Sequence, residues 1–247
     1  MSAKRKYSWG FSYAKYPQPT IEALQKQAEQ TLRKAGEKSR QYQPVHVTGT
    51  QLCRHWWGKA WCRAIESYSD ISNRLARGRR YLKADTVLDL QLAPGEIHAL
   101  VQGSRVRPYK VQITLGPLSD QNRKKIEEAC VGFLPNMEAL LNGDLPPTVA
   151  EVFTQEGGLF PRRWELHIRC SCPDDAILCK HAAAVLYGVG VRIDENPFLF
   201  FQLRGISVEK LIGQKLESRV EEMLSHAQDA PTDRTLPEEE IGKLFGV

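Results

Sequence analysis

Apolar residues recur at every third or fourth position in several stretches of the chain, which predicts amphipathic helices. The first helix is expected from Thr20 to Gly36, because a glycine closes its pattern. A second is expected at about 51–68, with Trp57 and Trp61 along one side. We interpret these tryptophans as core anchors rather than as a platform for stacked bases, because large aromatic side chains mainly supply buried area. Similar patterns predict helices from Ser119 to about Leu134, from Pro146-Pro147 through Phe153, and from Ser207 through Leu224.

Alternating apolar and polar residues predict β-strands in the middle of the chain. Three strands, Val87–Leu92, Ile97–Gln102 and Tyr109–Leu115, are separated by short turns and so indicate an antiparallel meander. The same alternation from Trp164 to Cys172 predicts a further strand after a glycine pair. An apolar run, Phe198 to Phe201, either caps the core or forms a docking patch, and we favour the core.

The segment Arg169–His181 contains three of the six cysteines and one of the six histidines. Cys170 and Cys172 alternate with a serine at the end of the expected strand, so both side chains leave the same face. Cys179 and His181 come just before an apolar run that is typical of a buried helix. Three thiolates and one imidazole are a complete tetrahedral ligand set for one structural zinc ion. The sequence therefore predicts a zinc site that joins a strand to a helix.

The ligand pattern Cys-x-Cys, six residues, then Cys-x-His resembles the SWIM zinc finger family. Three upstream segments are also similar to bacterial SWIM proteins, so that the resemblance extends over most of the chain: Trp56-Trp57-Gly58-Lys59-Ala60-Trp61, Arg77-Gly78-Arg79 and Gln102-Gly103-Ser104-Arg105. The resemblance implies a role in binding DNA or protein. It also implies an association with Swi/Snf-type ATPases, because genes of this family often lie beside genes for such ATPases.

Together these patterns predict an α+β fold. We expect a helical N-terminal region with a small antiparallel β-meander, followed by a zinc-stabilised SWIM-type ββα region and a C-terminal helix. Four segments are expected along the 247 residues. They are an extended N-terminal arm (1–18), an α+β module with basic loops (19–135), the SWIM region with the C-terminal helix (136–225), and a linker with a short amphipathic tail (226–247).

The composition is that of an ordinary soluble globular protein, with 42% hydrophobic and 26% charged residues. No apolar run approaches the roughly 20 residues that a membrane span needs. The basic N-terminus leads into no apolar signal core. We therefore expect no membrane association and a cytoplasmic location, including association with the nucleoid. The formal net charge of +5 weakly favours an anionic partner.

Basic residues gather in two stretches that we expect to be loops on either side of the meander. Each stretch also contains glycine and tyrosine; arginine binds phosphate oxygens, glycine permits close approach, and tyrosine stacks on bases. This composition predicts a nucleic-acid surface, and the resemblance to the SWIM family implies DNA rather than RNA. The alternative is that these side chains are solvated or pair with nearby carboxylates such as Asp85 and Asp89. The candidate contacts are Arg77, Arg79, Arg80, Arg105, Arg107 and Lys110.

The remaining chemistry favours a binding protein over an enzyme. A zinc ion held by four protein ligands cannot activate water, and no common catalytic motif is present. We expect no small-molecule substrate. The C-terminal tail is too short to fold alone, and Leu244 and Phe245 on its apolar edge are candidates for docking on a partner.

The sequence thus predicts a non-catalytic, zinc-binding accessory protein. It would bind nucleic acid, a protein partner, or both. The protein partner is expected to be a Swi/Snf-type ATPase or part of the transcription or repair machinery. The alternative is a pure protein–protein adaptor, in which the zinc is only structural and the basic loops do not contact nucleic acid.

Overall fold

A computed structural model of the chain describes residues 19–67, 72–133, 146–174 and 176–207, together with nine positions between 210 and 225. The expected N-terminal arm lies outside the described residues. The same is true of the C-terminal tail with Leu244 and Phe245, and their predicted roles stay predictions.

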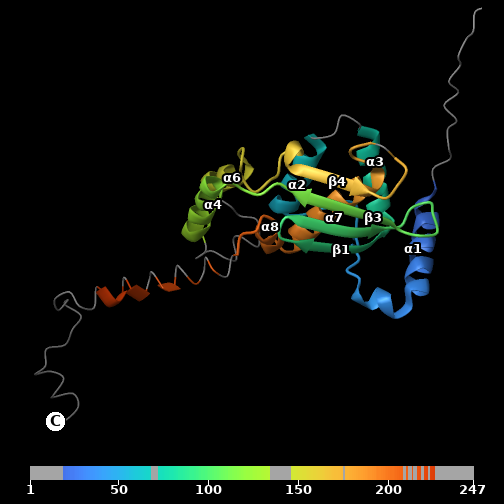
Figure 1. The fold of residues 1–247 in the computed structure, drawn as a ribbon, viewed down its shortest axis with the longest axis horizontal. Coiled ribbons are helices and arrows are strands. Elements are labelled where there is room, and N and C mark those ends of the chain that lie inside the picture. The colour runs from blue at the N-terminus through green and yellow to red at the C-terminus, as the bar shows by residue number, and fades with distance from the viewer. Residues whose placement is uncertain are drawn as a thin grey trace, which may run out of the picture.

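A four-stranded sheet forms one layer of the molecule (Figure 1). Its strands are β1 (Val87–Ala93), β2 (Glu96–Val101), β3 (Tyr109–Leu115) and β4 (Leu166–Cys170). They lie in the order β1-β2-β3-β4 and every neighbouring pair is antiparallel. The predicted meander is therefore confirmed. The strand β4, which carries the first predicted zinc ligand, is the fourth strand of this sheet. It pairs with β3, so β3 and β4 are the two strands of the expected ββα unit.

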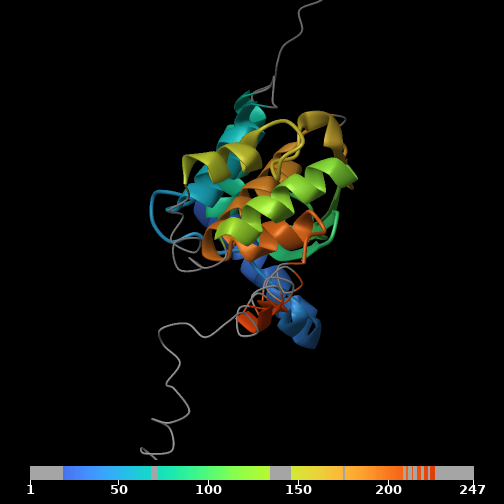
Figure 2. The ribbon, with the colours of Figure 1, turned by 90° about the vertical axis from the view of Figure 1, so that its left-hand side faces the viewer.

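The helix α7 (Lys180–Glu195) lies at the centre of the fold. It is buried from His181 through Val191, which is unusual for a helix of a small domain and follows from its run of alanine, valine and glycine. One side packs on the sheet, and the other packs on α2 (Trp56–Ser67) and α3 (Ser72–Lys83). Figure 2 shows these helices on one side of the sheet. The layers are thus the sheet, α7, and the pair α2 and α3.

The arginine-rich segment before β1 was expected to be a loop, but it forms the helix α3. Leu75 and Leu82 are buried on its inner side, and Gly78 between them faces α7. A Cβ at Gly78 would lie 2.5 Å from the Cβ of Ala183. The glycine therefore allows two helix backbones to approach each other, rather than allowing a phosphate to approach a loop.

The other helices lie close to where the pattern placed them. Thr20 and Ser119 accept hydrogen bonds from backbone N–H groups three residues on, at 3.2 Å each, and cap the helices that follow. Phe200 and Phe201 are buried, so the apolar run belongs to the core as favoured above. The predicted helices among them are α1 (Ile21–Ala35), α4 (Asp120–Phe133) and α6 (Pro147–Thr154). The two 3₁₀ helices η1 (Gly36–Gln41) and η3 (Arg163–Glu165) and the short helix α8 (Phe198–Leu203) were not predicted as helices.

Trp57 and Trp61 are almost fully buried, with 0% and 1% of their surface exposed. Trp61 also donates a hydrogen bond from Nε1 to the carbonyl of Leu186 in α7, at 2.7 Å. Both tryptophans therefore anchor the core, as interpreted from the sequence. None of the helices in the described part of the chain combines the length and the apolar character needed to cross a membrane.

The two faces of the sheet differ in character. The inner face is apolar and packs against α7, while the outer face carries polar side chains and is covered by none of the helices that the structure describes. Because side chains alternate along a strand, Cys170 at the end of β4 points inward, toward the start of α7, and Arg169 points outward. The sheet thus positions one predicted zinc ligand beside the helix that carries another.

Candidate metal centre

The four predicted zinc ligands come together at the N-terminus of α7. Cys170 ends β4 and Cys172 follows it in the turn, whereas Cys179 precedes α7 and His181 lies in its first turn. Their ligand atoms all lie within 4.8 Å of one another, and Cys170 Sγ is 3.9 Å from His181 Nδ1. In a tetrahedral zinc site, bond lengths of about 2.0–2.3 Å place the donor atoms roughly 3.3–3.8 Å apart. The observed arrangement fits a zinc ion after a contraction of roughly 1 Å or less.

The thiol groups of this centre differ in their readiness to ionise. A hydrogen bond from the Cys170 thiol, followed by hydrogen bonds from His181 and from the N–H of Ala182, lowers the pKa of Cys179 to about 3. The hydrogen bond with Cys179 and burial raise the pKa of Cys170, and burial raises that of Cys172. These hydrogen bonds thus favour the thiolate form of Cys179 before a metal binds. Zinc would displace the protons of the other two thiols, as metal binding to cysteine generally does.

The imidazole of His181 is held in place by aromatic packing. Its ring lies 4.3 Å from the ring of Tyr109, at 30°, and 5.5 Å from the ring of Tyr81, at 75°. A Cβ at Gly103 would lie 2.8 Å from His181 Nε2 and 2.4 Å from the Tyr109 ring, so this turn has room only for glycine. Nδ1 is thereby directed at the thiols, while the buried Nε2 has no hydrogen-bond partner among the described residues.

An ion pair ties the metal-binding turn to α3. Arg74 Nη1 lies 2.7 Å from Asp174 Oδ2, and both side chains are mostly buried. Asp174 also accepts a hydrogen bond from the N–H of Ala176, at 3.3 Å. The turn between the two ligand pairs is thus supported from a helix that is distant in sequence.

The predicted nucleic-acid contacts fall into two groups. Arg105, Arg107 and Lys110 are exposed, in the β2–β3 connection and at the start of β3. The other three lie on α3, where Arg79 pairs with Glu66 and stacks on Tyr187, and Arg80 donates to the carbonyl of Pro19; Arg77 lies close to Tyr81. For Arg79 on α3, the structure therefore supports the alternative interpretation, in which the arginine pairs with a carboxylate of the same chain instead of contacting nucleic acid.

No sequence pattern indicated the aromatic cradle around His181. Tyr81 and Tyr109 were read only as parts of basic segments, and Gly103 only as a turn residue. The one usable signal was Gly103, which lies shortly before the strand that begins at Tyr109. That signal does not indicate that both residues contact His181.

A second group of cysteines lies against the other end of α7. Cys53 Sγ and Cys62 Sγ are 3.7 Å apart, and Gly190 of α7 packs beside both. Near them, the Asp194 carboxylate accepts hydrogen bonds from the N–H groups of Arg54, at 2.6 Å, and His55, at 2.8 Å. In the part of the chain that the structure describes, this group does not reach three potential metal ligands in mutual contact.

Comparison with known proteins identifies part of this arrangement. A sequence model of the SWIM zinc finger family matches residues 163–189, the segment that contains all four clustered ligands. The chain is also 34% identical over 172 residues to an uncharacterized protein of Mycobacterium tuberculosis. That match covers 69% of this chain and 62% of the mycobacterial protein. No solved structure matches the chain.

Proposed function

We propose that the chain is a zinc-binding, non-catalytic accessory protein that binds nucleic acid next to its metal centre. One zinc ion would be held by Cys170, Cys172, Cys179 and His181, and would fix the end of β4 to the start of α7. With four protein ligands, such an ion supplies structure and no reactive water. The nucleic acid would be bound by the connection between β2 and β3, residues 104–107, called here the basic loop.

The observation that carries this proposal is that the residue leading directly into the basic loop lies against the metal centre. Gly103, the residue just before the loop, packs against the imidazole of His181. The four loop residues are themselves exposed. The position of the loop therefore depends on the position of a zinc ligand. A metal bound to His181 would therefore also support the residue from which the loop starts.

The loop backbone is held from below by a chain of hydrogen bonds. The buried Gln102 side chain donates from Nε2 to the carbonyls of Gly103, at 2.9 Å, and Arg105, at 2.7 Å. Its Oε1 accepts from Thr31 Oγ1 of α1, at 2.7 Å. Because the backbone is already ordered, little conformational entropy would be lost on binding a ligand.

The charges around the loop suit a phosphate backbone. Arg105 lies over Tyr109, with its Cζ 5.7 Å from the ring centre, and Lys180 lies over Tyr81 at 5.6 Å. Within the described residues, Arg105, Arg107 and Lys110 form no ion pair with a carboxylate, so that all three charges are available to an anion. Arginine and lysine in such positions supply most of the affinity for nucleic acid.

Binding of labelled oligonucleotides to the zinc-loaded full chain tests the proposal. We expect an affinity that falls as salt rises, and that falls about tenfold or more when Arg105→Glu and Arg107→Glu are combined. The matched control combines Lys124→Glu and Lys125→Glu on α4, which change the net charge equally. Equal affinity of the loop variant and the wild type, at equal zinc content, would exclude the basic loop from binding.

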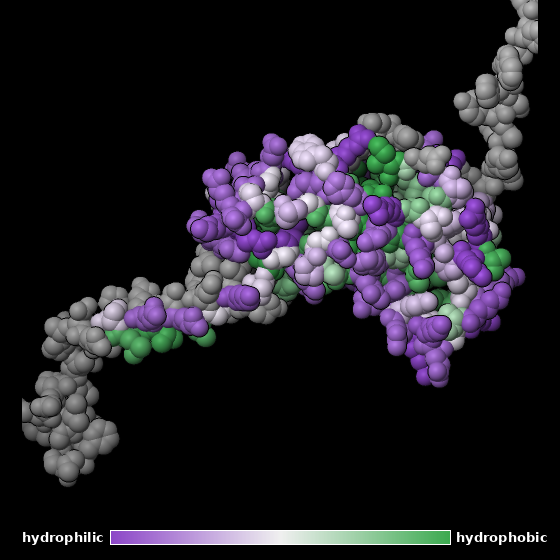
Figure 3. All heavy atoms as spheres, in the orientation of Figure 1, coloured by the Kyte–Doolittle hydropathy of each residue, from purple (hydrophilic) through white to green (hydrophobic). Residues whose placement is uncertain are grey.

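A second candidate function, docking of a protein partner, is favoured by the helical positions near residue 220. Four apolar side chains there are 47–72% exposed and share one face of a helix, since they are spaced by four, three and one positions: Leu216, Val220, Met223 and Leu224. Figure 3 shows apolar surface along one side of this segment. Glu217 and Glu221 lie along one edge of the stripe. These features suit an apolar groove with one basic edge on a partner protein.

This second function would be tested by affinity purification from the native host, with nuclease treatment. Combining Leu216→Asp and Met223→Asp should remove the partner and leave oligonucleotide binding unchanged. A Swi/Snf-type ATPase is the partner that the family resemblance suggests. If the variant retains every partner of the wild type, this helical face is not the docking site.

A further inference from the structure

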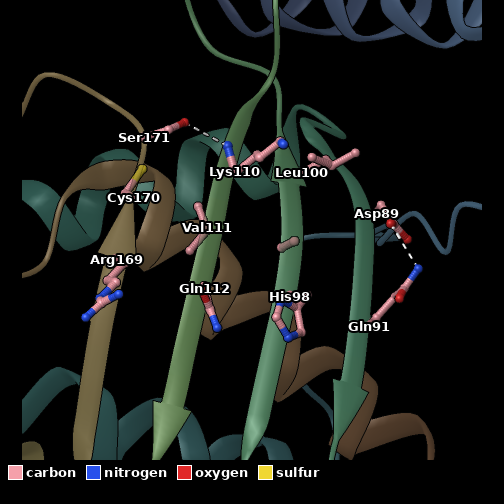
Figure 4. Close-up of a pocket in the computed structure, with 11 residues that line it drawn as sticks. Asp89, Gln91, His98, Leu100, Lys110, Val111, Gln112, Arg169, Cys170 and Ser171 are labelled. Atoms are coloured by element: carbon pink, nitrogen blue, oxygen red, sulfur yellow. Dashed lines mark hydrogen bonds between the residues drawn. The ribbon is translucent and has the colours of Figure 1, made fainter.

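The outer face of the sheet is an open polar surface, beside the metal centre and the basic loop. Figure 4 shows side chains from all four strands standing on it. They enclose a shallow hollow of about 570 Å³. Its floor includes Leu100, and its walls are formed by side chains that donate or accept hydrogen bonds.

Four of these side chains form a straight row across the strands. Strand pairing places Gln91 opposite His98, His98 opposite Gln112, and Gln112 opposite Arg169. Neighbouring strands lie about 4.8 Å apart, so the row spans roughly 14 Å. An extended ligand that crosses the sheet would therefore meet a hydrogen-bonding group from every strand.

The two halves of the face differ in charge. On β1 and β2, Gln91 donates to Asp89 at 3.2 Å, and His98 lies 2.9 Å from Glu96, so the acidic groups there already have partners. On β3 and β4, the side-chain nitrogens of Lys110 and Arg169 have no carboxylate partner among the described residues. The positive half continues directly into the basic loop, because Lys110 follows the loop along the chain.

From this arrangement we infer that the outer face of the sheet binds a single strand of nucleic acid. Its phosphates would lie along β3 and β4, on Lys110 and Arg169. Its bases would extend over Leu100 toward Gln91 and His98. This inference rests on the proposed function and names the form of nucleic acid that is bound.

The width of the sheet prevents this face from entering the major groove of a duplex. The major groove of B-DNA is about 12 Å wide and admits a helix or a two-stranded ribbon, whereas the row alone spans roughly 14 Å. A flat four-stranded face can therefore reach base edges only where the bases are unpaired. The glutamine amides each offer a donor and an acceptor to such edges, and Leu100 offers apolar contact to a base ring.

The test compares a labelled 12-nucleotide single strand, as DNA and as RNA, with the duplex of the same sequence. The full chain is used with one equivalent of zinc. We expect the single strand to bind about tenfold or more tightly than the duplex. Combining Lys110→Glu and Arg169→Glu should weaken binding and lower the salt slope by about two, one for each phosphate contact. The DNA and RNA arms show whether the 2′-hydroxyl contributes.

A second pair of variants separates base contacts from phosphate contacts. Combining Gln91→Ala and Gln112→Ala should weaken single-strand binding severalfold and leave the salt slope unchanged, because amides do not release counterions. Lys124→Glu combined with Lys125→Glu on α4 is the control for the net charge of the Lys110→Glu and Arg169→Glu variant, because both pairs change the charge equally. If the charge-reversal variant loses zinc, the milder pair Lys110→Gln and Arg169→Gln replaces it.

The outcomes distinguish this inference from the proposed function. If the basic-loop variant weakens binding but the sheet variants do not, or if the duplex binds as tightly as the single strand, the sheet face is not the binding site and the proposed function stands. If no oligonucleotide binds at all, both are wrong, and the face is left to a protein partner.

Discussion

Cysteine side chains gather at both ends of α7, and the two groups differ in the number and direction of their neighbours. At the N-terminal end, three thiols and one imidazole lie within 4.8 Å of one another. Toward the C-terminal end, Cys53 and Cys62 lie 3.7 Å apart, and the nearby Asp194 carboxylate already accepts two backbone hydrogen bonds. One group has a full set of donors for a metal, and the other has its donors committed to packing.

The difference arises from the elements that meet at each end. At the N-terminal end a strand finishes and a helix begins, so that two short pairs of ligands converge across a turn. At the other end, the thiols are packed against a glycine of α7: a Cβ at Gly190 would lie 3.1 Å from Cys62 Sγ. Proximity of cysteines is thus insufficient for a metal site; the donors must also be directed at a common point that the chain leaves open.

Loss of a zinc ligand is expected to have the largest effect of any change in either group. Cys172→Ser should abolish stoichiometric zinc binding and destabilise the fold by up to roughly 10 kcal/mol, the scale of structural zinc in small modules. Because α7 lies in the common core, the loss should reach beyond the turn from Pro173 to Leu178. Elemental analysis and urea unfolding measure the two effects.

The matched control for this change is Cys62→Ser, which removes a thiol from the other end of α7. It should retain one zinc ion per chain. A Cys172→Ser protein with one bound zinc and unchanged stability would show that these ligands do not form the metal centre. Loss of zinc from both variants would contradict the distinction between the two groups.

The parts of the fold that could be predicted from sequence are those set by local pattern. The strands of the meander show alternation within six or seven residues each, and the helix caps lie next to the turns that they close. The helix α3 was mistaken for a loop because its arginines and Gly78 obscure the spacing of Leu75 and Leu82. The role of Gly78 depends on Ala183, which is distant in sequence and adjacent in space.

The metal centre likewise has a part that could be predicted from local sequence and a part that could not. All four ligands fall between Arg169 and His181, so spacing alone predicted a set that the structure brings together. The cradle of Tyr81, Gly103 and Tyr109 comes from three separate elements, and no local pattern joins them to a histidine. The pairing of β4 with β3 was also missed, since alternation predicts a strand but not its neighbour.

Removal of the Asp194 carboxylate should have the next largest effect, and should leave the metal centre intact. Asp194→Ala leaves two backbone N–H groups before α2 without their acceptor. The Asp194 side chain is only 9% exposed, so water can hardly replace it. We expect a loss of about 3 kcal/mol in the free energy of unfolding, since hydrogen bonds to charged groups contribute about 1.5–3 kcal/mol each. Urea unfolding measures this, with zinc content determined in parallel.

The neighbouring Glu195 provides the control for Asp194. Its side chain is 58% exposed and lies 3.6 Å from Arg192, so Glu195→Ala should cost less than about 1 kcal/mol. Equal destabilisation by the two variants would mean that the acceptor role of Asp194 is unimportant. A loss of zinc in Asp194→Ala would mean that the two ends of α7 are coupled.

The smallest expected effect is a loss of stability at alkaline pH. It should come from the Cys53–Cys62 pair and not from the cysteines of the metal centre. A hydrogen bond with Cys62 and burial raise the pKa of Cys53 above its ordinary value. The folded-state pKa is then higher than the unfolded-state pKa of about 8.5, so the stabilisation is complete below that pH and is lost as the pH rises above it. Thiolates bound to zinc carry no such protons and add no such loss.

Between pH 8 and pH 10, under reducing conditions, the zinc-loaded wild type should therefore lose about 2 kcal/mol more of its unfolding free energy than Cys53→Ala does. Burial also raises the pKa of Cys130 to about 12, but that thiol is present in both proteins and cancels in the difference. Urea unfolding at the two pH values measures each loss. Equal losses in the two proteins would show that Cys53 is not held as a neutral thiol, and would remove the chemical distinction between the two ends of α7.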